Sequence, residues 1–205
     1  MSIRIIVCVR QIIDPLTPAS EFKVDPARKR AVLPPGRKLV ISDYDEVAVE
    51  AALRIKDTRG AEVTALSLGD GSAKEALRRC LAMGADKGVL LCDPAFDDAD
   101  SLATARALAQ AIKKLGEFDL VLCGRQEGDW DAGQVGSGTA ALLGIPVVSV
   151  VGRIDIGDNG SAVVERIVAD GRDVIEMPLP ALLTVSSEIG EPRYPPVRRV
   201  LADAR

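Results

Sequence analysis

The sequence lacks histidine altogether and holds few aromatic residues, with three Phe, two Tyr and one Trp among 205. Histidine is the most common general base and the most common metal ligand in proteins. Its absence excludes a Ser-His-Asp hydrolase, a Cys-His protease and a zinc enzyme with histidine ligands, and we expect no metal site. The aromatic side chains are too few for a surface on which nucleic-acid bases stack.

An excess of positive charge and long apolar runs are also missing. Lys and Arg number 26 against 30 Asp and Glu, which gives a net charge of −4. This balance disfavours binding to nucleic acid or to an anionic membrane surface. No stretch approaches the ~18 unbroken apolar residues of a membrane span, and the start of the chain does not have the pattern of a signal peptide. We therefore expect no membrane span and a cytoplasmic location.

Cysteine is scarce and scattered. The four residues Cys8, Cys80, Cys92 and Cys123 show no C-x-x-C spacing. Three of them end or interrupt apolar runs that are typical of strands, so we interpret them as small buried side chains in a reducing compartment.

Short runs rich in Val, Ile and Leu alternate with amphipathic stretches along most of the chain. Such an alternation predicts a mainly parallel sheet between two helical layers, with right-handed crossovers. The predicted strands are residues 3–9, 62–68, 88–92, 119–123 and 147–151. The predicted helices are residues 43–59, 72–83, 101–115 and 132–143. Ser72 and Glu75 have the S-x-x-E spacing of a capping box at the start of the second helix.

Two regions break this alternation. Residues 11–41 are too long for an ordinary connection, and we expect a small hairpin excursion around Asp25-Pro26. After residue 151 the apolar period changes to two, and residues 153–156 and 162–168 flank a Gly157-Asp-Asn-Gly160 turn signal. A C-terminal β-hairpin and then a strand at 181–185 are expected. Residues 1–190 are predicted to form one α/β domain, and residues 191–205 an arm over its surface.

The segment 123–139 has the composition of a phosphate-binding loop. It carries glycines at 124, 128, 133, 136 and 138 between a predicted strand and a predicted helix. Glycine lets backbone N–H groups approach a ligand closely, and the start of a helix favours an anion. Arg125 can bind a phosphate with two hydrogen bonds, and Gln126, Gln134 and Thr139 offer neutral ones. Ligands of such sheets bind at the carboxyl ends of the strands, so we predict a nucleotide there.

The residues of this segment can also be interpreted without a phosphate. The segment matches neither the P-loop spacing nor the G-x-G-x-x-G fingerprint. Asp131 and Gln134 could cap the following helix. The glycines at 133, 136 and 138 could allow close packing of helix on sheet. Asp129 and Asp131 would repel a phosphate, which favours a capping role or a contact with ribose. Trp130 either packs on a neighbouring residue or lies near a flavin or an adenine.

At this segment the chain resembles the β subunit of electron transfer flavoproteins, including the nitrogen-fixation-associated and bifurcating branch. Residues 124–136, GRQEGDWDAGQVG, are similar to the family's nucleotide loop G-[RK]-Q-x-x-D-x-D-x-x-Q-x-G. Residues 82–87 are similar to its A-M-G-A-D-[RK] turn, and residues 7–14 to its opening V-x-V-K-x-x-x-D. Residues 42–50 and several short segments between 164 and 194 also match in the family's order. The resemblance covers nearly the whole chain.

The resemblance implies a three-layer, Rossmann-like fold of the adenine-nucleotide-binding HUP type. It implies an electron carrier rather than an enzyme, without a catalytic residue of its own, that works as a heterodimer with an α subunit. FAD would lie between the subunits, and the β subunit would bind AMP or a second FAD. Acyl-CoA dehydrogenase-type or quinone-reductase proteins would be its redox partners. The cofactor contacts that the resemblance implies are Cys8, Val9, Ser42, Asp45, Leu68, Gly69, Gly124, Arg125, Gln126, Asp129, Asp131, Gln134, Val135, Gly136, Gly138 and Thr139.

The sequence departs from the family's pattern in three ways. Ser42 stands where the family has Asn, and Trp130 where it has Gly or Asp. The sequence ends at Arg205, whereas family members continue through a recognition loop and an arm that wraps the α subunit, so weaker assembly is expected. Two alternative functions stay open: a stand-alone adenine-nucleotide sensor on the same fold, and an enzyme that activates its substrate by adenylation.

Overall fold

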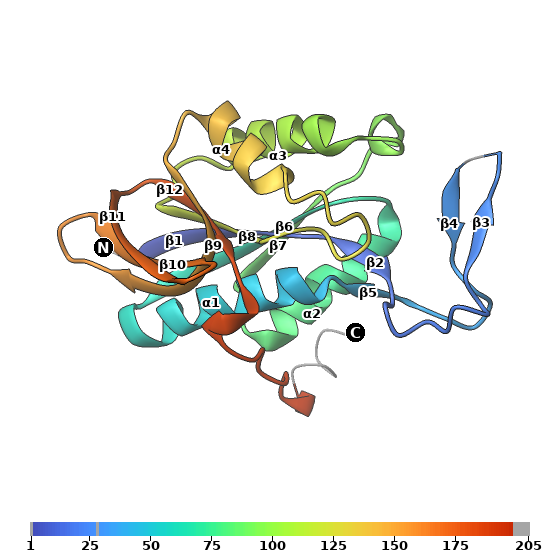
Figure 1. Cartoon of the computed structure of the whole chain (residues 1–205), viewed down its shortest axis with the longest axis horizontal. Helices are drawn as coiled ribbons and strands as arrows, with labels where there is room; N and C mark the ends of the chain where they lie inside the picture. Colours follow the sequence, from blue (N-terminus) through green and yellow to red (C-terminus); the bar gives the residue numbers. More distant parts are fainter. Residues whose placement is uncertain (1, 28, 199–205) are drawn as a thin grey trace.

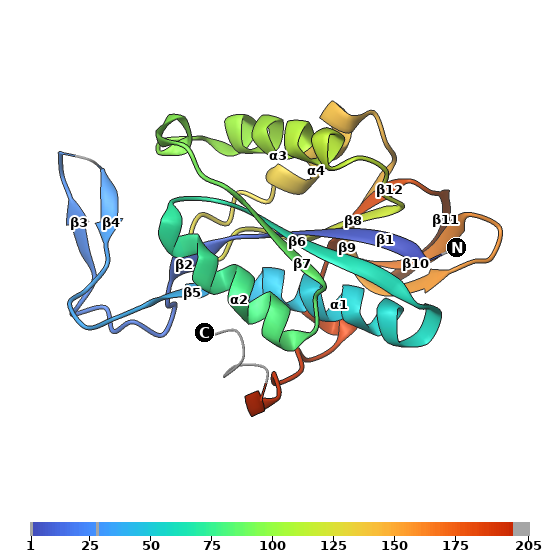
Figure 2. The ribbon, with the colours of Figure 1, turned by 180° about the vertical axis from the view of Figure 1, so that it is seen from behind.

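The computed structural model describes residues 2–27 and 29–198 and contains three layers (Figure 1). A central sheet is covered on one face by α1 (Asp43–Arg59) and α2 (Lys74–Met83). Its other face is covered by α3 (Ser101–Leu115) and α4 (Val135–Leu143). The view from behind shows the same division (Figure 2). A hydrophobic cluster lies between the sheet and each helical layer, and this confirms the predicted three-layer α/β fold.

The sheet has eight strands in the order β11-β10-β9-β12-β8-β1-β6-β7. Every pairing from β9 to β7 is parallel, and β9, β10 and β11 pair antiparallel. The bounds are β1 Ile3–Val9, β6 Ala61–Leu68, β7 Lys87–Leu91, β8 Leu120–Gly124, β9 Val147–Ile156, β10 Ser161–Val168, β11 Gly171–Pro178 and β12 Ala181–Val185. The chain adds β6 and β7 on one side of β1 and then returns to place β8 on the other. The strand order therefore reverses between β1 and β8, which is where ligands bind in such sheets.

The central strands are buried because helices cover both faces. Every residue of β8 and of β12 is buried. Unbroken apolar runs are the sequence signature of such strands, which explains why the predicted bounds of β1 and β12 are confirmed. Those of β6, β7, β8 and β10 differ from prediction by one residue. The predicted bounds of α1 and α3 are also confirmed.

Two predictions about helix starts are wrong. Ser72 does not cap α2, because Asp70 accepts a hydrogen bond from the Ser72 backbone N–H at 2.8 Å and caps a short 3-10 turn, Gly71–Ala73, before α2 begins. The helix predicted from residue 132 begins at Val135. A left-handed backbone at Asp131 and at Gly133 keeps the preceding residues out of the helix.

The C-terminal half of the sheet is larger than predicted. Residues 147–156 form one strand, where the change of apolar period after residue 151 predicted two separate ones. A Cβ at Gly152 would lie 2.7 Å from Ile167 Cδ1, so this glycine allows β9 and β10 to pack closely. The expected hairpin is extended by a third antiparallel strand, β11, which the prediction missed. β11 is an edge strand with mostly exposed or half-buried residues, and its charged side chains hide the apolar alternation.

The predicted excursion after β1 is confirmed. β2 (Gln11–Ile13) pairs with β5 (Leu39–Ile41) beside the main sheet. Between them, β3 (Lys23–Asp25) and β4 (Arg30–Val32) form a hairpin that projects from the body, at the right of Figure 1.

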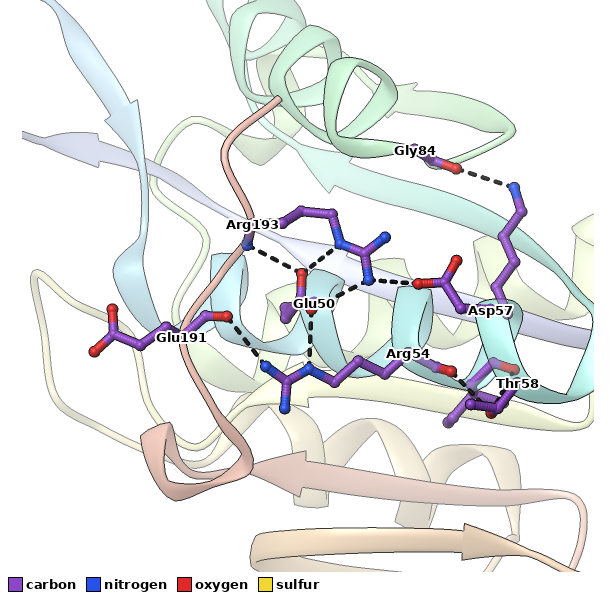
Figure 3. A network of polar contacts seen from close by, with 9 residues as sticks. Glu50, Arg54, Asp57, Thr58, Gly84, Glu191 and Arg193 are labelled. Carbon is purple, nitrogen blue, oxygen red and sulfur yellow. Dashed lines mark hydrogen bonds and ion pairs between the residues drawn. The ribbon is translucent and has the colours of Figure 1, made fainter. Parts of the chain in front are cut away.

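The segment after β12 passes through a 3-10 turn, Ser187–Ile189, and then lies against α1. Figure 3 shows Arg193 reaching across the helix to Glu50 and Asp57, with Nε–Oε2 and Nη2–Oδ2 distances of 2.8 Å. Residues 191–198 of the predicted arm therefore lie on the surface and are held by ion pairs. Residues 199–205 of that arm lie outside the described residues, and the arm as a separate unit stays a prediction.

Candidate functional site

A cavity, partly open to solvent, lies at the point where the strand order reverses. Its walls come from the ends of β1, β6 and β8, the start of α1, one face of α3 and the segment between β8 and α4. Nine of the predicted contacts line it: Cys8, Val9, Asp45, Leu68, Gly124, Arg125, Gln126, Val135 and Gly136.

The structure does not bring the other seven predicted contacts to the cavity wall. They are Ser42, Gly69, Asp129, Asp131, Gln134, Gly138 and Thr139. Thr139 is buried and donates its hydroxyl to the Val135 carbonyl of its own helix, at 2.8 Å. Ser42 is also buried, and its hydroxyl has no partner among the described residues. That these seven residues contact a ligand stays a prediction.

Six lining residues were not among the predicted contacts: Arg10, Thr104, Leu108, Cys123, Glu127 and Gly133. Thr104 and Leu108 are four residues apart and therefore share one face of α3. The spacing was visible in the sequence, but nothing there indicated that this face meets the end of β1. Arg10, Glu127 and Gly133 lie within or beside the segments that were singled out.

Asp45 connects the two strand ends that flank the cavity. Its carboxylate accepts the Arg10 N–H at 2.8 Å and the Gly124 N–H at 3.2 Å. Burial raises the pKa of this carboxyl group to about 7, and the two backbone hydrogen bonds lower it only in part. Asp45 is therefore a buried carboxyl group that joins the two strand ends, and its charge changes near neutral pH.

Arg125 presents an uncompensated positive charge to the cavity. Its guanidinium carbon lies 5.2 Å from the centre of the Tyr44 ring, within the range of a cation–π contact. Its Nε is buried without a hydrogen-bond partner, and within residues 2–27 and 29–198 the side chain forms no ion pair. A buried donor without an acceptor is costly, so this position fits an anionic ligand group.

The loop between β8 and α4 is held by contacts among its own side chains. Asp131 accepts a hydrogen bond from Gln126 at 2.7 Å, and Glu127 accepts the Gly133 N–H at 2.9 Å. Asp129 forms an ion pair with Arg10, with an Oδ2–Nη2 distance of 2.9 Å. The interpretation of Asp131 as a helix cap is therefore wrong. Asp131 is therefore hydrogen-bonded within the loop, and Asp129 is paired with Arg10, the residue after β1. These contacts explain how acidic residues can lie beside an anion site.

The start of α4 is open toward the cavity. Gln134 precedes the helix, and in the described chain no side chain caps it. The uncapped N–H groups and the helix dipole favour an anion there. Gly136 lets the helix approach β12, because a Cβ at this residue would lie 2.6 Å from Thr184 Cγ2. At Gly138 the corresponding distance is 3.2 Å to Ala105 Cβ on α3, and Gly133 faces only its own loop. Packing of helix on sheet is therefore confirmed for Gly136 alone, and is wrong for the other two glycines.

The exposure of Trp130 argues against packing on a neighbouring residue, and its position near a flavin or an adenine stays a prediction. The side chain is 72% exposed and does not line the cavity.

Within the described residues, no helix has the length and apolarity that a membrane crossing requires.

Comparison with known proteins points to one family. The family model for the electron transfer flavoprotein domain matches residues 32–203. The caffeyl-CoA reductase–Etf complex subunit CarD of Acetobacterium woodii is 46% identical over 192 residues, which cover 93% of this chain and 71% of CarD.

Two further relatives match this chain over shares of both sequences that are close to those for CarD. The electron transfer flavoprotein subunit beta of Thermoanaerobacterium thermosaccharolyticum is 41% identical over 96% of this chain and 73% of its own length. Protein FixA of Azorhizobium caulinodans is 38% identical over 98% of this chain and 70% of its own length. Each relative therefore extends beyond the part that this chain matches.

Proposed function

The chain belongs to the electron transfer flavoprotein β-subunit family, and from this premise we propose that it binds an adenine nucleotide in the cavity between β1 and β8. It acts as an electron carrier subunit, not as an enzyme in its own right. The proposal names AMP or FAD as the occupant of this cavity and places the phosphate at Arg125 and the start of α4.

One observation carries this proposal: the cavity has a positive end with unused hydrogen-bond donors. Arg125, whose Nε has no partner, lines it together with Val135 and Gly136, the first two residues of the uncapped helix α4. A phosphate would accept from both and would remove the cost of the buried Nε donor. The apolar wall formed by Leu68 and Leu108 suits a planar ring system on the opposite side.

The residues present suit a nucleotide that is bound and oriented rather than chemically attacked. A flavin supplies the redox chemistry in proteins of this kind. The chain's own groups would position the phosphate through Arg125, hold the two strand ends together through Asp45, and exclude water with the side chains of α3. AMP would serve as a structural ligand in the same place, and the FAD that exchanges electrons would be shared with the α subunit.

The proposed partners follow from family membership. An α subunit completes the carrier, which passes electrons between dehydrogenases and an acceptor of the acyl-CoA dehydrogenase or quinone-reductase type. CarD is named as a subunit of a caffeyl-CoA reductase–Etf complex, which supports assembly with a reductase that acts on a CoA thioester. The cytoplasmic location stays a prediction. Among the relatives reported above, none is named as a stand-alone nucleotide sensor or an adenylating enzyme.

The test is to identify and then titrate the ligand. The chain is co-expressed with an α subunit, the complex is purified and denatured, and the released nucleotide is identified by mass spectrometry. Calorimetric titration of AMP and of FAD then compares the wild type with Arg125→Gln. Loss of a charged hydrogen-bond donor should weaken binding roughly 10- to 100-fold.

The control is Arg106→Gln, since Arg106 lies exposed on α3 away from the cavity lining. This variant should bind like the wild type. If no nucleotide is released from the complex and none binds the folded chain, the proposed function is wrong.

A further inference from the structure

Two of the four cysteines stand side by side in the wall of this cavity. Cys8 is the second-last residue of β1, and Cys123 is the second-last residue of β8. Both line the cavity. The sequence interpretation treated all four cysteines alike, as inert buried side chains, and only the pairing of β1 with β8 brings these two together.

The strand register places them opposite each other. β1 pairs with β8 in parallel, with Val7 facing Leu122, so the next position along each strand is a cysteine. Neighbouring strands lie roughly 4.8 Å apart, within the Cα separations of about 4.4 to 6.8 Å that a disulfide spans. Both side chains belong to the hydrophobic cluster under α3 and α4 and therefore point to the same face of the sheet.

The surroundings of the pair differ from those of the other two cysteines. Cys80 is fully buried away from the cavity, and burial raises the pKa of its thiol to about 12. Cys92 is exposed and free, in the turn after β7. Cys8 and Cys123 are 6% and 5% exposed, and the opening of the cavity gives a small reagent access to them.

We propose that Cys8 and Cys123 form a redox-active dithiol that closes to a disulfide in the cavity wall and reopens on reduction. The oxidant is a small-molecule disulfide of the glutathione class. One thiol attacks it and forms a mixed disulfide with release of one small thiol. The second protein thiol then attacks that mixed disulfide, so that one S–S bond forms in the protein, two protein thiols are oxidised, and two small thiols leave.

The electrostatics of Cys123 agree with a contact between the two thiols. A hydrogen bond from Cys8, together with burial, raises the pKa of Cys123 well above its ordinary value.

The consequence for the nucleotide rests on the proposed function. Cys8 and Cys123 directly precede Val9 and Gly124, whose backbones also line the cavity. A covalent bridge would replace two thiols with a disulfide of fixed geometry and so alter the wall against which the nucleotide packs. The oxidised form should therefore bind AMP more weakly, roughly fivefold, which corresponds to the loss of one neutral hydrogen bond.

The first experiment needs no nucleotide. The full chain is reduced, desalted, treated with glutathione disulfide and denatured, and its free thiols are counted while its intact mass and its disulfide-linked peptides are determined. The wild type, with its four free cysteines, should lose three thiols: two to a Cys8–Cys123 linkage, and the exposed Cys92 to a mixed disulfide with glutathione. Cys92→Ser should lose only the two thiols of the linkage. Cys123→Ser should stop at a mixed disulfide on Cys8.

A second reagent tests proximity without oxidation. A trivalent arylarsenic oxide condenses with two neighbouring thiols, forming two As–S bonds and releasing one water. The wild type and Cys92→Ser should take up one arsenical, and Cys8→Ser and Cys123→Ser none.

The outcomes separate this proposal from the proposed function. If Cys92→Ser keeps its three thiols after oxidation and takes up no arsenical, the dithiol does not exist, whether or not the reduced chain binds AMP. If the disulfide forms but the reduced chain binds no nucleotide, the proposed function fails and the dithiol stands. Equal AMP affinity of the reduced and oxidised chains would overturn the effect on the cavity.

Discussion

At the scale of single residues, Asp45 explains how the cavity keeps its shape. One carboxylate joins the end of β1 to the end of β8 through two backbone N–H groups. The groups that face it are Arg10, which lies close enough to lower its pKa, and Glu127, which raises it. Because the Arg10 side chain is paired with Asp129, burial has the largest effect and the pKa of Asp45 is raised.

The raised pKa of Asp45 predicts an unusual dependence of stability on pH. The folded protein holds this proton to about pH 7, whereas the unfolded chain releases it near its ordinary pKa of 3.8. The contribution of Asp45 to the free energy of unfolding is therefore largest below pH 3.8 and falls as the pH rises toward 7. With no histidine in the chain, few other groups titrate between about pH 5 and about pH 8.

Urea unfolding at several pH values across that range measures this effect. The wild type should lose stability as the pH rises, and Asp45→Asn, which cannot titrate, should show a much flatter profile. Asp158→Asn serves as the control, since Asp158 is also acidic but exposed, in an ion pair with Arg59 away from the cavity. Parallel profiles for the wild type and Asp45→Asn would show that another group titrates.

At the scale of secondary-structure elements, the approach of α4 to the sheet depends on Gly136. A methyl group there would overlap Thr184 on β12. Gly136→Ala should destabilise the fold by about 1 to 3 kcal/mol, the usual cost of overpacking, and narrow the cavity at the phosphate end.

Gly138→Ala is the matched control for this prediction. Its nearest neighbour, Ala105 Cβ, is 3.2 Å away, and alanine gains about 1 kcal/mol in helix propensity over glycine. We expect a near-neutral effect. The measurement is the denaturation midpoint of both variants, and an equal loss in both would contradict the role of the α4–β12 contact.

A second prediction at this scale concerns the segment that crosses α1 (Figure 3). Burial works to raise the pKa of Glu50, but hydrogen bonds from Arg193 and Arg54 outweigh it and lower the pKa overall. Arg193→Ala leaves the buried carboxylate with Arg54 alone, and we expect a loss of about 2 kcal/mol. Residues 191–198 should also become sensitive to protease.

Limited proteolysis and urea unfolding of Arg193→Ala, with Arg106→Ala as the control, test this role. Because the pKa of Glu50 is lowered in the folded state, its stabilisation is present above its ordinary pKa and is lost as the pH falls through the folded value. Unchanged proteolysis of Arg193→Ala would indicate that the other contacts of the segment hold it.

At the scale of the whole molecule, the cavity is the place where both halves of the sheet meet. Its wall takes residues from β1, β6, β8, α1 and α3, which belong to segments far apart in the sequence. A ligand that touches all of them binds only the folded chain and therefore raises its stability by mass action.

AMP at about one hundred times its dissociation constant should stabilise the fold by about 2.7 kcal/mol. For a chain of this size that corresponds to an increase of roughly 5 to 10 °C in Tm. Adenosine, which lacks the phosphate, should give a smaller shift at the same concentration in a thermal-shift assay. Equal shifts for both ligands would contradict the assignment of Arg125 and α4 as the phosphate site.

The sequence alone determined the three-layer α/β fold and the position of the glycine-rich loop after β8. Continuous apolar runs define buried parallel strands such as β12, and the amphipathic patterns of α1 and α3 define their bounds, because both signals are local. The glycine-rich loop after β8 was recognisable because backbone access to a ligand requires glycine near one strand end.

Only the tertiary structure decided which residues share the cavity. Thr104 and Leu108, the Arg10–Asp129 ion pair and the Cys8–Cys123 contact depend on strand order and on the face that α3 turns to the sheet. The charged edge strand β11 was missed because its pairing with β10, not its own pattern, makes it a strand. These features arise from contacts between residues distant in sequence, and a pattern read along one chain carries no information about such pairings.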